Sequence, residues 1–335
     1  MQLTEYGHLI IDEVGASLRK RRGRILLASR EGKREIPLKS VRDLVIMGKV
    51  SITSDLLIAL AESGIDLLVT TTTGRPVARL NPARAGGTAK NRYEQYKSMS
   101  DGRGILIAKS LIIGKIRNQI SNMRYYSKAR RMQTDLSMMF HEAAEMMRIE
   151  MEKLERTDFK DLEEARKGVM VVESRVADLY WDMMKLELGR WGFVTREKRE
   201  AKDPVNVLLN VAYNLLSSSI WREVLRFGLD PFLGYIHVER PGRLSLVYDL
   251  MEPFRPMVDR FTVSFLRSYK NDLSSDGIGN AISSLKNSYF SEFLNDSLEY
   301  KGRKLKLNSL MFFYVQELVS SLREARSPIT PYMPW

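Results

Sequence analysis

The sequence predicts an α+β protein, with a small amino-terminal β-rich domain followed by a larger, mostly α-helical domain. Up to about residue 80, short apolar runs rich in Ile, Leu and Val are separated by glycines, as in strands joined by turns. From about residue 90, apolar residues recur at i, i+3, i+4 and i+7 over lengths too great for strands. The length of 335 residues also favours two domains, because one hydrophobic core rarely grows that large.

The β-rich domain is expected over residues 1–82. Its candidate strands lie at residues 8–14, 24–28, 44–47 and 65–70. One helix is expected among them, because residues 54–62 have helical spacing and Thr53 or Ser54 can cap the first turn. The following segment, 83–89, contains a proline, a glycine pair and small residues, which is typical of a linker.

The helical domain is expected over residues 90–326. Its predicted helices span 105–126, 133–155, 168–188, 205–227 and 307–325. Residues 233–250 interrupt this pattern, because two short apolar runs flank a turn at 240–243 and can pair as a hairpin. Residues 327–335 contain three prolines and are expected to form a loose tail.

Composition excludes several classes of protein. The chain has no Cys, which rules out a disulfide scaffold, thiolate metal ligands and a cysteine nucleophile. It has no apolar run long enough to span a membrane and no secretory signal, so a cytoplasmic protein is expected. The 53 Lys and Arg exceed the 41 Asp and Glu by 12, and this excess favours a polyanionic partner such as nucleic acid.

Three acidic residues are candidates for chemistry. Asp249 and Glu252 are three residues apart and share one face of a helical turn. Pro253 restricts both residues to the start of a helix. An alternative to a catalytic role is therefore that Asp249 is an N-cap and Glu252 a first-turn acid. Glu173 shares a stripe with Ala177 and two aromatic residues, and a buried acid there needs a metal ion or a salt bridge to a buried Arg.

His237 completes a set of oxygen and nitrogen donors. It follows an apolar run and precedes the predicted turn, and hairpin pairing would bring it towards Asp249. Together with Glu173 and Glu252, it forms a carboxylate and imidazole set without sulfur. Such donors select Mg²⁺ or Mn²⁺.

Basic and aromatic residues near these acids are candidates for binding DNA. Arg240, Arg243 and Arg255 are predicted to position phosphates, although solvated loop residues are an equal alternative. Arg84 can extend the basic track from the linker, and Tyr248 can contact DNA near the cleavage point or pack in the core. Acids that hold a cation beside arginines that hold phosphate suggest metal-assisted phosphodiester chemistry.

The order and spacing of four motifs resemble those of the CRISPR-associated adaptation integrases, the family of the first-numbered Cas protein. The motifs are Glu173-x3-Ala177-x2-Tyr180-Trp181, Asp203-Pro204-Val205-Asn206, Gly234-Tyr235-Ile236-His237, and the run from Ser245 to Pro256. The resemblance covers most of the chain. It implies a metal held by Glu173, His237 and Glu252, with Asp249 as a further acid of the site. Many members carry Asp at the position where this chain has Glu252. The Glu252 carboxylate is also a competent oxygen ligand.

The resemblance also implies an activity and partners. The chain would be a metal-dependent DNA endonuclease and integrase that joins the 3′-OH ends of short DNA fragments to a repeat array by transesterification. It would form a homodimer through its strand domain and a complex with the small second-numbered CRISPR-associated protein. A ligand role for His237 requires the neutral imidazole, so activity should fail in acid.

Three other functions remain open from the sequence. A recombinase could use one of the 14 tyrosines as a nucleophile, and it would form a covalent protein–DNA adduct without a divalent ion. A non-enzymatic DNA-binding scaffold would use the acids in structural salt bridges. A metal-dependent hydrolase would act on small phosphoesters.

Overall fold

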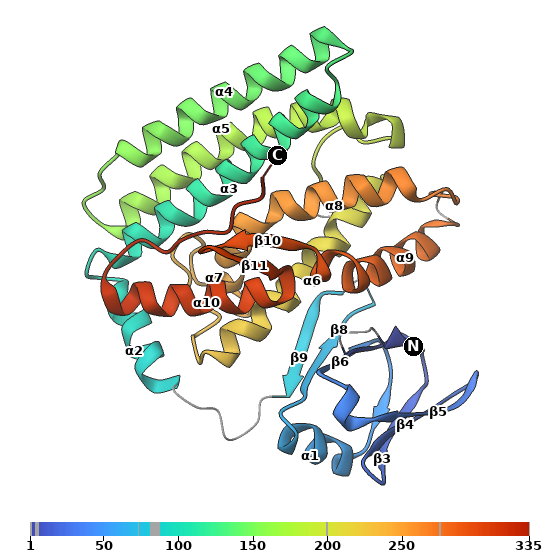
Figure 1. Cartoon of the computed structure of the whole chain (residues 1–335). Helices are drawn as coiled ribbons and strands as arrows, with labels where there is room; N and C mark the ends of the chain where they lie inside the picture. Colours follow the sequence, from blue (N-terminus) through green and yellow to red (C-terminus); the bar gives the residue numbers. More distant parts are fainter. Residues whose placement is uncertain are drawn as a thin grey trace.

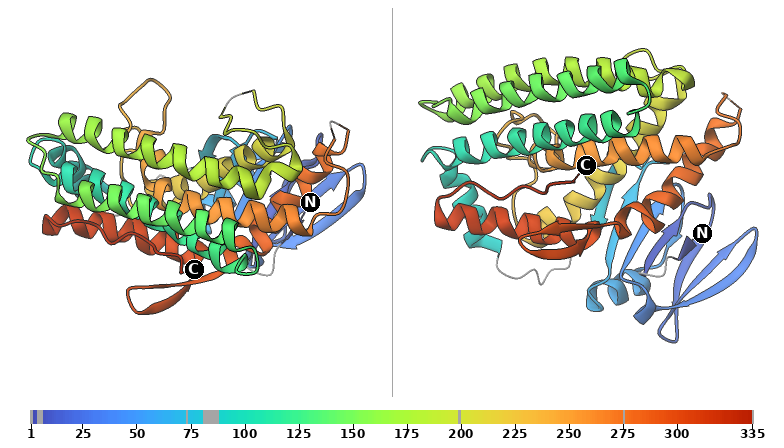
Figure 2. Two further views of the ribbon diagram at one scale, coloured as in Figure 1. Left: turned by 90° about the horizontal axis from the view of Figure 1, so that it is seen from above. Right: turned by 45° about the horizontal axis from the view of Figure 1, so that its top comes forward.

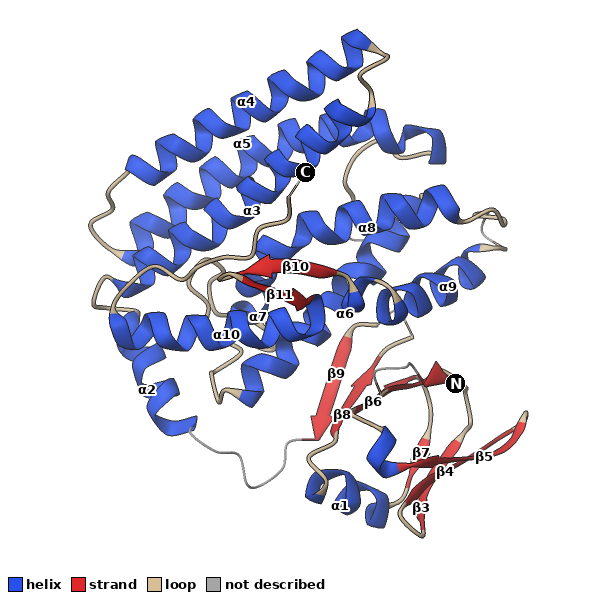
Figure 3. Cartoon of the chain, viewed as in Figure 1, coloured by secondary structure: helices blue, strands red, loops and turns tan. Residues whose placement is uncertain are grey.

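The computed structural model describes residues 2–3, 7–72, 74–80, 88–198, 200–274 and 276–334. Strands dominate up to residue 80 and helices dominate after it, so the predicted α+β class is confirmed (Figure 1, Figure 3). The first part contains β1 (Gln2–Leu3), β2 (His8–Ile11), β3 (Ser17–Arg21), β4 (Arg24–Ser29), β5 (Gly32–Pro37), the 3₁₀ turn η1 (Leu38–Ser40), β6 (Asp43–Met47), β7 (Ser51–Ile52), α1 (Ser54–Glu62), β8 (Asp66–Thr70) and β9 (Pro76–Leu80).

The strands of this part form two sheets, in the orders β1–β2–β6–β8–β9 and β5–β4–β3–β7. In the first sheet, β2, β6 and β8 run parallel. Because side chains alternate between faces, Leu44 and Ile46 join a core with α1 and the second sheet, whereas Val45 and Met47 join the core of the helices. Burial of both faces explains why these strands are continuously apolar.

The second part is built from helices and short turns. They are α2 (Thr88–Ser98), α3 (Arg103–Ala129), α4 (Thr134–Arg156), α5 (Leu162–Leu188), η2 (Gly189–Trp191), α6 (Pro204–Arg226), α7 (Ser245–Met251), η3 (Glu252–Phe254), α8 (Arg255–Ser268), α9 (Ile278–Ser291), η4 (Phe293–Asn295) and α10 (Leu307–Glu324). The helices predicted from periodicity are confirmed as α3, α4, α5, α6 and α10. Residues 81–87, which include most of the predicted linker and Arg84, lie outside the described residues, and the last two linker residues already belong to α2.

The helices form a layered bundle. Helices α3, α4 and α5 pack side by side, and α6 lies on the other side of α3, in contact with α7, α8, α9 and α10 (Figure 2). Helix α6 is buried on most of its surface, and its side chains also close one face of the first sheet. Within the described part of the chain, no helix has the length and hydropathy that a membrane span requires.

The predicted hairpin at 233–250 is wrong. The chain forms a loop up to Leu244, and α7 begins at Ser245. Leu246 and Leu250 lie four residues apart and are both buried, which is the spacing of a helix rather than a strand. The hairpin of the helical part lies instead at β10 (Ser297–Tyr300) and β11 (Arg303–Lys306), which pair antiparallel.

The carboxyl-terminal segment is not loose, contrary to the expectation for residues 327–335. Asn118 on α3 donates a hydrogen bond to the Pro331 carbonyl and accepts one from the Met333 amide. The Ser121 hydroxyl donates to the Met333 carbonyl. Thr330 packs against Gly114, where an added Cβ would lie 2.6 Å from the Thr330 side chain. Up to residue 334, the segment therefore runs as a strap along α3 (Figure 1).

Candidate active site

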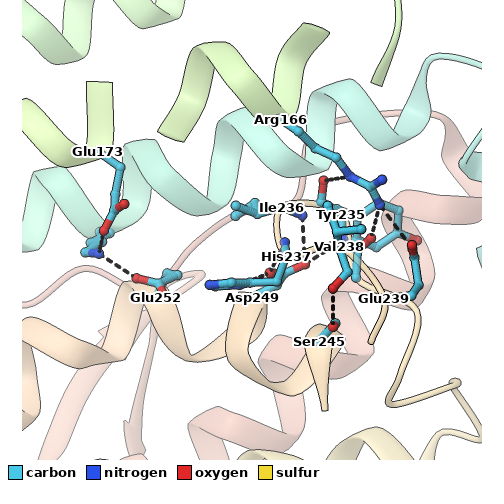
Figure 4. Close-up of polar contacts among 12 residues, drawn as sticks. Arg166, Glu173, Tyr235, Ile236, His237, Val238, Glu239, Ser245, Asp249 and Glu252 are labelled. Atoms are coloured by element: carbon cyan, nitrogen blue, oxygen red, sulfur yellow. Dashed lines mark hydrogen bonds and ion pairs between the residues drawn. The ribbon is translucent and has the colours of Figure 1, made fainter. Parts of the chain in front are cut away.

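Two of the predicted acids converge on one ammonium group. Glu173 lies on α5 and Glu252 opens η3, and Figure 4 shows their carboxylates pointing towards each other. Lys115 of α3 lies between them, with Nζ 2.5 Å from Glu173 Oε1 and 2.7 Å from Glu252 Oε2. Lys115 and Glu252 are buried, whereas the Glu173 side chain is 28% exposed. The predicted alternative of a salt bridge at Glu173 is therefore present, with a buried Lys in place of an Arg.

The charges in this cluster stabilise one another. Arg255 Nε lies 3.0 Å from Glu252 Oε1. Burial alone would raise the pKa of Glu252, but the positive charges of Arg255 and Lys115, with a smaller effect of His237, lower it to about 2. Burial lowers the pKa of Lys115, but the charges of Glu252 and Glu173 outweigh it, so the pKa is raised. Glu252 and the Lys115 ammonium are therefore both charged at neutral pH.

Asp249 holds the loop that carries His237. Its fully buried carboxylate accepts hydrogen bonds from the backbone amides of Tyr235, Ile236 and His237, at 2.5, 2.9 and 3.0 Å. Gly234 allows this close approach, because an added Cβ would lie 2.7 Å from Asp249 Oδ2. Three amides that a sheet would otherwise pair are thus satisfied by one carboxylate, and we call this group the Asp249 clamp.

The position of Asp249 differs from the prediction. Asp249 lies within α7 and is neither at the start of a helix nor an N-cap. Glu252 does open a helical turn, since it begins η3 and is followed by Pro253 and then by α8. Proline is compatible with this place because the first residues of a helical turn do not need an amide donor.

His237 is oriented by the clamp. Its Nδ1 lies 2.6 Å from Asp249 Oδ1, so Nε2 is the nitrogen left for a ligand, and its side chain is 24% exposed. The ring of Tyr248 stands edge-on to the imidazole, with centroids 6.2 Å apart. A carboxylate behind an imidazole is the usual support of a metal-binding histidine.

The acid pair fits a cation, but a complete three-ligand group is not assembled. Within the described residues, no three His, Cys, Asp or Glu side chains are arranged to hold a metal ion. The two carboxylates nevertheless share one nitrogen as their common partner. Oε2 of Glu252 is buried and has no hydrogen-bonded partner among the described residues, apart from its ion pair with Lys115. Such oxygen donors suit Mg²⁺ or Mn²⁺.

The predicted DNA-binding residues occupy different settings. Arg240 is exposed and Arg243 half-buried in the loop between His237 and α7. Arg255 is committed to Glu252 and lies over the ring of Tyr213, 5.0 Å from its centroid. Of these three arginines, Arg240 and Arg243 are accessible to a phosphate, as the prediction requires, whereas Arg255 is already paired.

Sequence reasoning missed two basic residues of the site. Arg166 on α5 donates to the carbonyls of Gly234 and Tyr235 and so holds the loop opposite the Asp249 clamp (Figure 4). Nothing in the local sequence indicates this contact. Lys115 had a signal, because it begins a polar stripe with Asn118, Gln119 and Asn122, at i, i+3, i+4 and i+7, on the buried face of α3.

Another buried acid lies seven residues after Glu252. Asp259 of α8 accepts hydrogen bonds from the hydroxyls of Tyr180 and Tyr213. Burial raises the pKa of Asp259 to about 6, although both hydroxyl bonds favour its ionised form. We call this group the tyrosine cluster.

The chain is similar to known proteins over its full length. Residues 9–294 match the family model described as CRISPR associated protein Cas1. The CRISPR-associated endonuclease Cas1 of Korarchaeum cryptofilum (strain OPF8) is 58% identical over 341 residues, which cover 100% of each chain. A casposase bound to integration product has the same fold, with a TM-score of 0.75 at 20% identity, covering 96% of this chain and 92% of that chain. A chain of a Cas6-RT-Cas1–Cas2 complex has a TM-score of 0.71 at 20% identity, covering 98% of this chain and 36% of that chain. The chain belongs to the CRISPR associated protein Cas1 family.

Proposed function

We propose that this chain is a divalent-metal-dependent DNA endonuclease and integrase of CRISPR adaptation, which joins the 3′-OH ends of short DNA fragments into a repeat array. One observation carries the proposal: carboxylates from α5 and η3 share a single cation beside an imidazole that a buried carboxylate orients. Membership of the Cas1 family supports the endonuclease and integrase class.

The acid pair and His237 would hold the metal ion. The oxygens of Glu173 and Glu252 and the Nε2 of His237 are the donors that we assign to it. A bound Mg²⁺ or Mn²⁺ supplies Lewis acidity towards a phosphoryl oxygen. The Asp249 clamp keeps the imidazole in one orientation, and Arg166 keeps the loop in place, so that Nε2 of His237 stays available as a donor.

The proposed reaction is a transesterification. The 3′-hydroxyl oxygen of the incoming DNA forms a bond to a phosphorus of the target while the bond from that phosphorus to the leaving oxygen breaks, and a proton passes from the attacking to the leaving oxygen. One ester bond replaces another, so no ATP is needed. Arg240, Arg243 and Tyr248 would contact the DNA beside His237. With water as the nucleophile, the same site would hydrolyse DNA.

The partners are proposed from similar proteins. The casposase structure holds an integration product, and the other complex contains Cas2. We assign DNA and a Cas2 protein as partners of this chain, and a homodimer formed through its strand domain. The net charge of +12 supports a polyanionic partner.

The test is strand joining of a labelled DNA fragment with Mn²⁺ by Glu173→Gln and His237→Ala. Each variant should lose roughly 100-fold in rate, because each removes a donor. Glu163→Gln is the matched control, since Glu163 lies on the same helix as Glu173 and forms an exposed pair with Lys167. Joining that persists in both variants, or in the presence of a chelator, contradicts the proposal. A covalent adduct after denaturation would indicate a tyrosine recombinase, and DNA binding without joining would indicate a scaffold.

A further inference from the structure

Lys115 occupies the place where a metal ion would be bound. Its ammonium contacts one oxygen of each acid of the pair, at 2.5 and 2.7 Å, and the residue is only 7% exposed. Together, Lys115 and Arg255 balance the two negative charges of Glu173 and Glu252. The cluster is therefore electrically complete without a divalent ion, and a divalent ion that enters it adds two positive charges to a neutral group.

The two basic residues of the cluster differ in how firmly they are held. Arg255 binds Oε1 of Glu252 and also lies over the ring of Tyr213. If Glu252 binds another cation, Arg255 keeps its contact with Tyr213. The Lys115 ammonium has its ion pairs with the same two carboxylates that the metal would use. An ammonium and a divalent cation on the same oxygens repel each other at close range. Lys115 is therefore the residue that has to move, and its four-carbon stem permits this.

We infer that Lys115 is a phosphate-binding residue of the site, whose ammonium holds the acid pair together without a divalent ion and moves to the DNA phosphate when the ion takes its place. The inference rests on the proposed function, because it requires a metal ion between Glu173 and Glu252. An ammonium displaced from two carboxylates in a buried site needs another anion, and the phosphate that the ion binds is the nearest one that the reaction supplies. Lys115 would then neutralise charge on the phosphate during the reaction.

The inference makes Lys115 a competitor of the metal ion in the absence of DNA. In Lys115→Met, the full-length chain should bind Mn²⁺ about 10-fold more tightly than the unaltered chain, because the ion no longer displaces an ammonium. Free Mn²⁺ is measured by electron paramagnetic resonance without DNA. Lys198→Met controls for the loss of one nearby positive charge, since Lys198 interacts electrostatically with both acids. Its affinity should change by no more than about 3-fold.

A second readout is thermal unfolding. Without a divalent ion, Lys115→Met leaves two carboxylates facing each other and should unfold at a lower temperature, and Mn²⁺ should restore the loss. Lys153→Met, which breaks an exposed pair with Glu150, should show neither effect. If Lys115→Met does not fold, Lys115→Gln retains one donor to the acid pair and tests the same two expectations.

Strand joining completes the test. Lys115→Met should bind Mn²⁺ and still lose roughly 100-fold in joining rate at saturating metal and DNA. Unchanged or weaker Mn²⁺ binding, or joining at the original rate, would overturn the inference. If Glu173→Gln binds Mn²⁺ as well as the unaltered chain, the proposed metal site fails. If Glu173→Gln weakens Mn²⁺ binding and Lys115→Met does not strengthen it, only the role of Lys115 fails.

Discussion

Glu252 and Asp259 lie seven residues apart on one continuous stretch of η3 and α8, and both are buried. Their pKa values nevertheless move in opposite directions, to about 2 for Glu252 and to about 6 for Asp259. Burial acts against ionisation of both. Glu252 is compensated by the charges of Lys115 and Arg255, whereas Asp259 is compensated first by two tyrosine hydroxyls and less by the more distant charges of Arg196 and Arg255.

The difference shows that the partner, rather than the depth of burial, decides the state of a buried acid. Full positive charges keep Glu252 ionised even in moderately acidic solution. Such an acid stays available to a cation, which the proposed metal site requires. The hydroxyls of the tyrosine cluster instead join α5, α6 and α8 through Asp259, which suits a structural role.

The largest expected effect comes from a third buried acid, Asp249, whose partners are backbone amides and one imidazole. Asp249→Ala leaves these buried donors without an acceptor and should lower the free energy of unfolding by about 4 kcal/mol. Urea unfolding measures the loss, and Asp161→Ala, at the exposed cap of α5, is the control. A loss below about 1 kcal/mol would mean that neutral donors contribute little to holding a buried acid.

The next effect tests the charged side of the comparison. Glu252 has a folded-state pKa of about 2 against an ordinary value of 4.5, so it stabilises the fold above pH 4.5, and this stability is lost as the pH falls towards 2. Glu252→Gln should therefore cost about 3 kcal/mol at pH 7 and remove most of the loss of stability in that acid window. The measurement is urea unfolding at several pH values. Equal acid sensitivity of the variant and the unaltered chain would contradict the role of Lys115 and Arg255.

Asp259 should behave in the opposite way. Its folded-state pKa of about 6 lies above the ordinary value of 3.8, so it contributes most stability below pH 3.8 and loses about 3 kcal/mol as the pH rises through 6. Asp259→Asn stays neutral and should abolish this decline. At pH 7 the variant should gain about 2 kcal/mol, since part of the benefit is offset by a weaker hydrogen bond. A variant less stable than the unaltered chain at pH 7 would show that the ionised form is the better partner of the tyrosines.

Periodicity predicted most of the fold. The long helices were identifiable because each must bury one apolar stripe against its neighbours, and α1 was marked by both spacing and a capping residue. The hairpin at 233–250 was wrong because its backbone amides are satisfied by the side chain of Asp249, which no alternation of apolar residues can reveal. The strap of residues 327–334 was missed for a similar reason, since Asn118 supplies its hydrogen bonds from a helix far away in the sequence.

The acidic residues of the candidate site could be predicted from the sequence, but the basic side chains that pair with them could not. Glu173 stood out because a charged residue interrupts an apolar stripe, and Glu252 because a proline follows it. The ammonium that joins them lies 58 residues before Glu173, and no local pattern links the two helices. Distant partners of this kind decide whether an acid is ionised, so the chemistry of the site could not be read from the acids alone.

The smallest expected effect comes from Tyr213, which contacts both the charged cluster at Glu252 and the tyrosine cluster at Asp259. It tests whether these two regions are independent. The hydroxyl of Tyr213 donates to Asp259, and its ring lies under Arg255, the partner of Glu252. Tyr213→Phe removes only the hydroxyl, so the pKa of Asp259 should rise further and stability at pH 7 should fall by about 1 kcal/mol. The ring stays in place, and the acid window that belongs to Glu252, between pH 4.5 and 2, should be unchanged. If urea unfolding shows a shift in that window as well, the hydroxyl network and the charged cluster act as one unit, and the contrast between Glu252 and Asp259 does not arise from their immediate partners.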